Sequence, residues 1–390
     1  MNRPTLASLV AAVLLLGACA GGEPTASPTP DDTRATTSAT ASPAAESVTV
    51  TVVGAGDILP HEPVVRSANR YAGGASGAYD FAPMFAEIAP IVEEADLAIC
   101  HLETTLSEDD TDLTVPRSLV LTSPREVATG LRSAGFDGCD FASNHSWDRG
   151  VEGLDETIGL LEEAGLAYAG PHADAARAGE PALHDVAGVT VAHLAYSYTL
   201  LNTWGPSTDI PPEAPWTGRA MWPVVQAEGI VADARAARAQ GADLVVLSMH
   251  WGEEYVAAPT QDQRTLAREV LESGTVDLIL GTHVHVIQPC ETIDGRTVFY
   301  GLGNLLSNQS PDTTRGRLLP TTQEGMVARA TFTIDGGEVS SVVDYQPTRV
   351  DLDGHVIELA TVEEHPQTHA RTVAAVESLG GEACAAMPRR

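Results

Sequence analysis

Short apolar runs alternate with amphipathic stretches from about residue 47 onward. In residues 47–54 the β-branched residues valine and threonine alternate, which is typical of a strand. Further strands are predicted where short apolar runs lie between turn residues, at 97–102, 138–142, 189–196, 243–249 and 276–280. Apolar residues at helical spacing predict helices between these strands, at 81–94, 124–133, 154–164, 223–240 and 266–273.

The pattern changes after residue 280, where only strands are predicted. These strands are expected at 284–292, 297–300, 327–334 and 339–350. A β-α-β-α series that ends in β-hairpins predicts an α/β protein with two packed sheets and helices outside them. In open α/β sheets, ligands bind beyond the carboxyl ends of the strands. The residues just past each strand are therefore the candidates for function.

Five predicted strands deliver potential metal ligands to the same edge. In chain order these residues are Asp57 and His61, His101 and Glu103, Asn144 with His145 and Asp148, His250, and finally His283 with His285. A single acid or histidine at a strand end is more often a cap or a hydrogen-bonded side chain, but five successive cases are hard to attribute to chance. If His283 and His285 lie on a strand, both rings share one face.

The types of donor atom indicate which ions the site would take. Imidazole, carboxylate and amide oxygen suit Mn, Fe or Zn, and no thiolate is included. Two such ions about 4 Å apart, bridged by one carboxylate, can hold a phosphate group for hydrolysis. The residues therefore predict two divalent metal ions of unspecified identity.

The order and local sequence of these motifs resemble a known family. The segments are Gly56-Asp57-Ile58-Leu59, Leu102-Glu103, Ser143-Asn144-His145, His250-Trp251-Gly252, Gly281-x-His283-x-His285 and Leu302-Gly303-Asn304. Their order is similar to that of the calcineurin-like metallophosphoesterases. Their local amino-acid sequences resemble more specifically those of the CapA family of capsule and poly-γ-glutamate synthesis proteins. The resemblance spans residues 54–309 and implies a four-layer metallophosphatase-like β-sandwich flanked by helices.

The resemblance also implies roles for individual residues. One metal ion would be held by Asp57 and His285, with His61, and the other by Asn144, His250 and His283. Glu103 would bridge the two ions. His145 would donate a proton to the leaving oxygen, with its tautomer fixed by Asp148. The candidates for substrate binding are Asn304, Trp251 and Glu254.

Two positions depart from the family pattern. The phosphoesterases have a histidine two residues after the first aspartate, where this chain has Leu59. The family's usual asparagine before Leu-Glu is His101 here. Two interpretations of His101 are open, an added metal ligand and a packed neighbour.

The N-terminal residues predict export. A short basic start and an apolar run from Leu6 to Leu16 are typical of a signal peptide, and Leu16-Gly17-Ala18-Cys19 resembles a bacterial lipobox. We therefore expect a lipoprotein signal peptide at 1–19, lipidation of Cys19, a disordered Pro/Ser/Thr/Ala linker at 20–47 and a CapA-like domain at 48–390. An ordinary signal peptide is the alternative. The expected location is the cell envelope, outside the cytoplasm and anchored to the membrane by lipid.

The chain has a formal net charge of −31. This charge argues against nucleic acid as a partner, because a phosphate backbone would be repelled. An anionic extracellular polymer would need metal ions or local cations to bind. A phosphoester is the other substrate class that the residues support, and a capsule synthesis complex is a possible assembly.

Five cysteines are present. With Cys19 lipidated, the other four can form three sets of disulfides in an oxidising compartment. Cys100 and Cys139 lie near the ends of neighbouring predicted strands, which favours this pair and leaves Cys290 with Cys384. Four free buried thiols are the alternative.

Three functions are compatible with the sequence. The first is an envelope-anchored CapA-like protein with a dinuclear metal hydrolase-type site, which acts in capsule or poly-γ-glutamate synthesis or processing. The second is a secreted metallophosphoesterase with an unrelated substrate. The third is a non-catalytic scaffold for polymer assembly, in which the metal site is structural.

Overall fold

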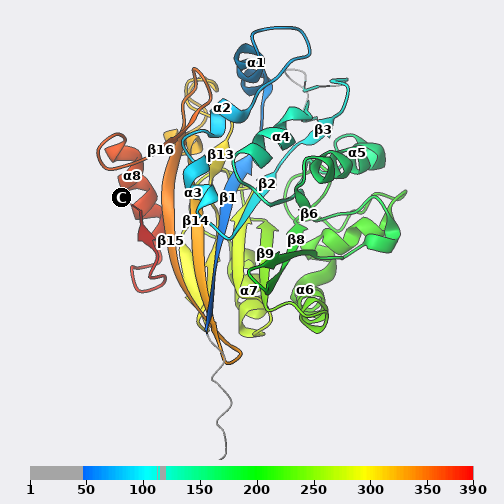
Figure 1. Cartoon of the computed structure of the whole chain (residues 1–390), viewed down its shortest axis with the longest axis vertical. Helices are drawn as coiled ribbons and strands as arrows, with labels where there is room; N and C mark the ends of the chain where they lie inside the picture. The colour runs from blue at the N-terminus through cyan, green and yellow to red at the C-terminus, as the bar shows by residue number, and fades with distance from the viewer. Residues whose placement is uncertain (1–46, 112, 115–119, 390) are drawn as a thin grey trace, which may run out of the picture. The chain divides into compact units, whose positions relative to one another are not determined.

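The first of two large sheets is built around β1 (Val48–Ile58). The computed structural model describes residues 47–111, 113–114 and 120–389, so the predicted signal peptide, Cys19 and almost all of the predicted linker lie outside the described residues. The order across the sheet is β16 (Ile357–Leu359), β15 (Glu338–Val350), β14 (Glu324–Asp335), β1, β2 (Leu97–Leu102), β5 (Gly138–Asp140) and β6 (Ala167–Ala169) (Figure 1). In addition, β13 (Asn304–Leu306) pairs with β1, and β17 (Met387–Pro388) pairs with β15.

The second sheet has six strands. Their order is β11 (Cys290–Ile293), β12 (Arg296–Phe299), β10 (Leu278–Thr282), β9 (Leu244–His250), β8 (Val189–Ser197) and β7 (Ala182–Val186). The four central strands are parallel, and the two edge strands are antiparallel to their neighbours. In the first sheet β1, β2, β5 and β6 are likewise parallel. A separate two-stranded sheet joins β3 (Thr105–Ser107) to β4 (Thr122–Pro124).

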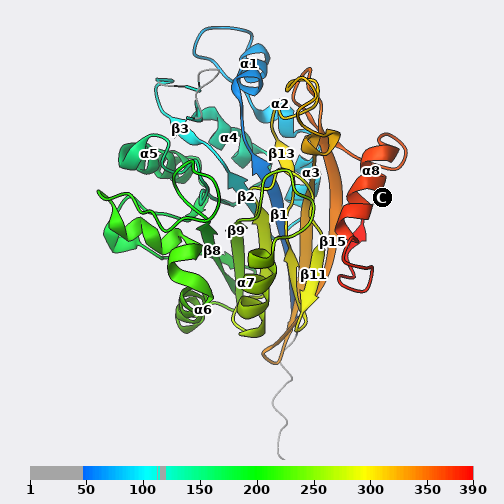
Figure 2. The same cartoon turned by 180° about the vertical axis from the view of Figure 1, so that it is seen from behind.

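Helices cover the outer face of each sheet. The helices are α1 (Glu62–Tyr71), α2 (Ala82–Phe85), α3 (Ala89–Glu93), α4 (Glu126–Ser133), α5 (Gly150–Glu163), α6 (Trp222–Ala239), α7 (Gln261–Glu272) and α8 (Pro366–Val376), with short 3₁₀ turns at Ala175–Arg177, Pro215–Ala220 and Pro320–Gln323. Figure 2 shows α6 and α7 beside the second sheet and α8 beside β15.

Three apolar clusters hold these layers together. One cluster packs the five helices α1–α5 against the first sheet, through residues such as Val64, Leu131 and Ala98. A second lies between the two sheets and includes Val52 and Phe299. The third joins α6 and α7 with the second sheet. The predicted α/β class, with two packed sheets between outer helices in four layers, is therefore confirmed.

Several predicted elements need correction. The helix expected at 81–94 is two short helices, because Pro90 lacks the N–H that a continuous helix would use. The strand expected at 284–292 is a loop up to Pro289, and only β11 follows it as a strand. The prediction missed the helices α1 and α8 and the short strands β3, β4, β6, β7, β13, β16 and β17.

Two disulfides link the described cysteines. Cys100 and Cys139 face each other on the neighbouring strands β2 and β5 and are bonded, and Cys290 is bonded to Cys384. Both favoured pairs are thus confirmed. Within the described residues, no helix has the length and apolar character needed to cross a membrane.

Candidate metal centre

Six acidic and imidazole side chains meet where parallel strands of both sheets end. They come from the end of β1, the end of β2 and the residue after it, the end of β9, and the loop after β10. All six are at most 4% exposed: Asp57, His101, Glu103, His250, His283 and His285. The predicted convergence of strand ends is therefore present. It unites five of the predicted ligands with His101.

Glycines permit this close approach of strands. A Cβ on Gly56 would lie 2.1 Å from the carbonyl oxygen of Gly303, and one on Gly281 would lie 2.0 Å from that of Tyr300. The backbone amide of Asp57, the residue after Gly56, donates a hydrogen bond to the Gly303 carbonyl at 2.9 Å. A side chain at either glycine would push the strand ends apart. The glycines beside the ligands thus have a packing role.

The loop that carries His283 and His285 has an uncommon backbone. Both residues have positive φ, 89° and 57°, a region that residues other than glycine rarely adopt. The His283 amide donates to Oδ1 of Asp57 at 2.9 Å, which fixes the loop against β1. The histidines are therefore oriented by a strained loop, and the expectation that both rings project from one face of a strand is wrong.

One candidate ligand group consists of Asp57, Glu103 and His285. Nδ1 of His285 lies 3.3 Å from Oδ2 of Asp57, and Nε2 lies 3.9 Å from Oε1 of Glu103. Nδ1 is also 3.0 Å from Oδ1 of Asn304, which can only accept a hydrogen bond. Asn304 therefore favours the tautomer with the proton on Nδ1 and leaves Nε2 free to bind a cation near Glu103.

A second candidate group consists of Glu103, His250 and His283. Nε2 of His250 lies 3.7 Å from Oε1 of Glu103 and 2.8 Å from Oδ1 of Asn144. Its other ring nitrogen faces the hydroxyl of Thr282 at 3.2 Å. The two groups share Glu103, which is the arrangement expected of a bridging carboxylate.

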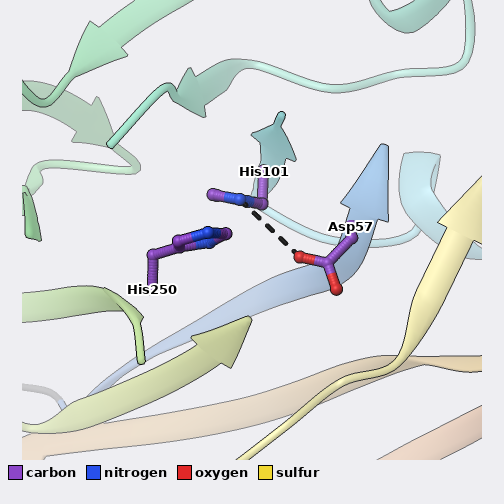
Figure 3. A group of neighbouring side chains, drawn as sticks. All are labelled: Asp57, His101 and His250. Atoms are coloured by element: carbon purple, nitrogen blue, oxygen red, sulfur yellow. Dashed lines mark ion pairs between the residues drawn. The ribbon is translucent and has the colours of Figure 1, made fainter. Parts of the chain in front are cut away.

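A third group contains Asp57, His101 and His250. Figure 3 shows the three side chains converging. The His101 and His250 rings are stacked, with 4.8 Å between their centroids. Nε2 of His101 is 3.7 Å from Oδ1 of Asp57. His101 thus belongs to the same cluster as the predicted ligands.

Burial and neighbouring charges shift the pKa values of the cluster strongly. Burial alone would lower the pKa of His285, but Glu103 and Asp57 raise it to about 10. Burial raises the pKa of Glu103 to about 7. By contrast, burial and the neighbouring His285 lower the pKa of His283 to about 3, so its ring is neutral. Neutral imidazole is the form that binds metal.

Several buried atoms of this cluster have no hydrogen-bond partner among the described residues. They include Nε2 of His101, Oε2 of Glu103 and Nδ1 of His283. Buried polar atoms nearly always have hydrogen-bond partners, so several exceptions in one cluster call for an explanation. Imidazole and carboxylate donors of this kind fit divalent Mn, Fe or Zn.

The predicted catalytic pair is assembled beside this cluster. Nδ1 of His145 lies 2.6 Å from Oδ2 of Asp148, and the same oxygen accepts from the Leu121 amide. The Asp148 carboxylate therefore holds the proton on Nδ1 and leaves Nε2 of His145 to exchange protons. His145 is 8% exposed, so its ring is nearly enclosed.

Other predicted residues lie in different surroundings. His61 belongs to none of the candidate metal groups of the described chain, and its Nδ1 accepts from the Asn308 amide at 3.3 Å. Asn304 is fully buried and donates to the Thr322 carbonyl and to Gln309, so it supports His285 from behind. Glu254 is half-buried, close enough to His285 to raise its pKa.

The substrate role expected for Trp251 is not supported. Its side chain is fully buried in the cluster between the second sheet and α6 and α7. Its indole N–H donates to the carbonyl of Tyr300 at 2.8 Å. Trp251 therefore packs beneath the site, because the residue after β9 turns back into the core.

The sequence interpretation also missed two residues of the site. The Tyr198 ring packs against the ring of His283, tilted by 38°, with 4.4 Å between ring centroids. Asp140 is the last residue of β5, and its Oδ1 lies 2.6 Å from Nδ1 of His101. Asp140 is opposite His101 in the parallel register, so a strand-end acid next to a strand-end histidine was the available signal.

The fold and the cluster together define an α/β/β/α protein with a buried candidate metal centre at its strand ends. The family model described as bacterial capsule synthesis protein PGA_cap matches residues 51–309, and the chain belongs to this family.

Curated relatives agree with this family. The chain is 29% identical to the capsule biosynthesis protein CapA of Bacillus anthracis, over 68% of this chain and 61% of that protein. It is 27% identical to the PGA biosynthesis protein CapA of Bacillus subtilis, over 60% of each chain. The matches thus span about three fifths of the length of these relatives.

Solved structures show only a remote likeness. A phosphatase from Mycoplasma pneumoniae aligns with a TM-score of 0.41 and 12% identity, over 76% of this chain and 94% of that one. The calcineurin-like phosphoesterase YfkN from Bacillus subtilis aligns with a TM-score of 0.41 and 13% identity, over 84% and 98%. The fold assignment therefore rests on the layers and strand order described above.

Proposed function

We propose that this chain is an envelope-anchored protein of capsule or poly-γ-glutamate synthesis or processing, with a hydrolytic centre that binds two divalent metal ions. The observation that carries the proposal is the sharing of Glu103 by two groups of buried ligands. The names of the relatives, which refer to capsule and PGA biosynthesis, support the polymer. Lipidation of Cys19 and the envelope location belong to the proposal and rest on the sequence alone.

The residues around the centre suit hydrolysis. Two bound divalent ions would polarise a phosphoryl or acyl oxygen and supply a nucleophile at neutral pH. The first ion would be held by Asp57 and His285 and the second by Asn144, His250 and His283, with Glu103 between them. His145 would give its Nε2 proton to the leaving oxygen, and Asp148 would keep its ring in the required tautomer.

Replacement of His145 by alanine tests the catalytic part of the proposal. We expect the variant to keep its metal and to lose roughly 10²–10⁴-fold in turnover of bis(p-nitrophenyl) phosphate, the usual range for a lost general acid. The matched control is His369→Ala, a half-buried histidine on α8. Unchanged turnover in His145→Ala would contradict a role in proton transfer.

The substrate needs a separate screen. Nucleotides, phospholipids, wall phosphodiesters and poly-γ-glutamate should be offered to the metal-loaded protein. Hydrolysis of poly-γ-glutamate, or of the bond that links this polymer to another molecule, is the expected result. Turnover of nucleotides alone would instead indicate a secreted phosphoesterase of unrelated substrate. Metal binding without any hydrolysis, together with normal polymer output from His145→Ala, would indicate a scaffold.

A further inference from the structure

His101 is the one member of the buried cluster that has no role in the proposed pair of metal sites. Its side chain is 1% exposed, and it lies at the end of β2, two residues before Glu103. It is within the same compact group of donor atoms as Asp57 and His250. Its position therefore requires an explanation of its own.

The two nitrogens of the His101 ring have different surroundings. Nδ1 lies 2.6 Å from Oδ1 of Asp140, a carboxylate that is itself 2% exposed. A carboxylate can only accept, so Nδ1 carries a proton and donates it. Nε2 is buried and has no hydrogen-bond partner among the described residues. The ring thus has one satisfied nitrogen and one that faces the cluster.

The free nitrogen faces a carboxylate. Nε2 of His101 is 3.7 Å from Oδ1 of Asp57, and a neutral Nε2 would present its lone pair to this oxygen. Two acceptors that face each other in a buried site repel unless a proton or a metal ion lies between them, and 3.7 Å is too long for the hydrogen bond that a proton on Nε2 would make. Two donors on one ion at metal–ligand distances of about 2.0–2.2 Å lie roughly 3–3.5 Å apart, close to the observed separation.

The number of ligands gives a second reason. Without His101, the first proposed ion has the protein ligands Asp57, Glu103 and His285, while the second has Glu103, Asn144, His250 and His283. His61 does not complete the first set, because its Nδ1 accepts from the backbone of Asn308. With His101, each ion would have four protein ligands, of which Glu103 is shared. Four ligands are what a tetrahedral site requires.

We infer that His101 is a metal ligand through Nε2, sharing an ion with Asp57, and that Asp140 is the positioning residue that fixes its tautomer. This inference rests on the proposed metal centre and deepens it. A histidine ligand whose other nitrogen donates to a carboxylate is a recurrent arrangement, and the carboxylate raises the basicity of the ligand. The pair spans β2 and β5, whose register places the two residues opposite each other.

The first test is the metal content of His101→Asn in the full chain, dialysed against Mn²⁺ or Zn²⁺ and measured by elemental mass spectrometry. We expect a decrease from about two ions per chain to about one. The control is His193→Asn, because His193 is also fully buried on a strand, bonds Ser248 and belongs to no candidate metal group of the described residues. It should keep both ions.

The outcomes separate this inference from the proposed function. Two ions in both His101→Asn and the parent chain would overturn the role of His101 and leave the metal centre standing. Fewer than one ion in the parent chain would overturn both. A crystal of the parent chain loaded with Mn²⁺ gives an answer even if His101→Asn does not fold. We expect an anomalous peak about 2.0–2.3 Å from Nε2 of His101, and peaks that do not touch this atom would refute the assignment.

Asp140→Asn tests the positioning role. We expect one ion to bind roughly 10–100-fold more weakly while the affinity for the other is unchanged, because an amide holds the ring less firmly. With Co²⁺ as the probe, the visible absorption of one of the two ions should shift. If Asp140→Asn bound both ions with the same affinities as the parent chain and gave the same spectrum, Asp140 would only pack against His101.

Discussion

The seam between the two sheets and the edge where their strands end are both buried, but they differ in chemistry. The seam is lined by apolar side chains such as Val52, Val246 and Phe299, which need no partner. The edge contains two carboxylates and four imidazoles, and several of their atoms lack a hydrogen-bond partner among the described residues. Apolar burial stabilises a fold by itself, whereas buried charge is costly unless it is neutralised. The contrast fits the proposal that the seam supports the fold and the edge binds cations.

The largest effect is expected from loss of the shared ligand. Glu103→Ala removes the carboxylate common to two ligand groups. We expect both ions to be lost, since each loses a ligand and the charge that bridges them. Elemental mass spectrometry and turnover of a phosphodiester measure the result. The matched control is Glu253→Ala, an exposed acid on the loop after β9. Full retention of metal in Glu103→Ala would contradict a shared ligand.

The converse effect is expected in the seam. Phe299→Ala leaves a cavity between the sheets, and we expect the free energy of unfolding to fall by about 3–5 kcal/mol. The metal content should remain unchanged in the folded variant. Denaturant titration measures the free energy of unfolding. The control is Val342→Ala on β15, where the valine is 71% exposed, and it should change stability by less than about 0.5 kcal/mol. If folded Phe299→Ala lost its metal, the two regions would not be independent.

A smaller effect is expected behind His285. Asn304→Ala removes the acceptor at Nδ1 of His285 and keeps all the ligands. Loss of such a supporting partner costs roughly 10–100-fold in metal affinity. A competition titration with a chelator measures this change. Asn69→Ala, which removes an amide that bonds two backbone carbonyls near α1, should leave the affinity as it is. Equal affinities in the two variants would show that Asn304 only fills space.

The smallest effect on the metal centre is expected from a histidine outside the cluster, which should change only the stability of the chain. Burial lowers the pKa of His193 to about 4, so the unfolded chain takes up a proton before the folded chain does as the pH falls. Stability should therefore decrease between pH 6.5 and pH 4, by up to about 1.4 kcal/mol per pH unit from this residue. His193→Gln should flatten the slope of unfolding free energy against pH in this window. An unchanged slope would mean that His193 does not remain neutral in the folded chain.

The sequence contained enough information to predict the layers and most of the candidate ligands. Parallel strands bring their carboxyl ends to one edge, so residues such as Asp57 and His250 could be placed together without coordinates. Cys100 and Cys139 could be paired for a similar reason, because both lie on strands that turned out to be neighbours.

Other features depend on contacts that no local pattern encodes. The loop at His283 and His285 resembles a strand in sequence, but the hydrogen bond from the His283 amide to Asp57 holds it with positive φ. Trp251 follows a ligand directly and yet points into the core. The partnership of His101 with Asp140 arises from the register of two strands, which only the folded chain determines.

The metal content of the purified chain tests the central claim most directly. After dialysis against Mn²⁺ or Zn²⁺ and removal of loosely bound metal, elemental mass spectrometry should find about two ions per chain, because Glu103 joins two ligand groups. A chelator should then remove both ions and lower the melting temperature. Less than one ion per chain, with a melting temperature that the chelator does not change, would contradict a dinuclear centre.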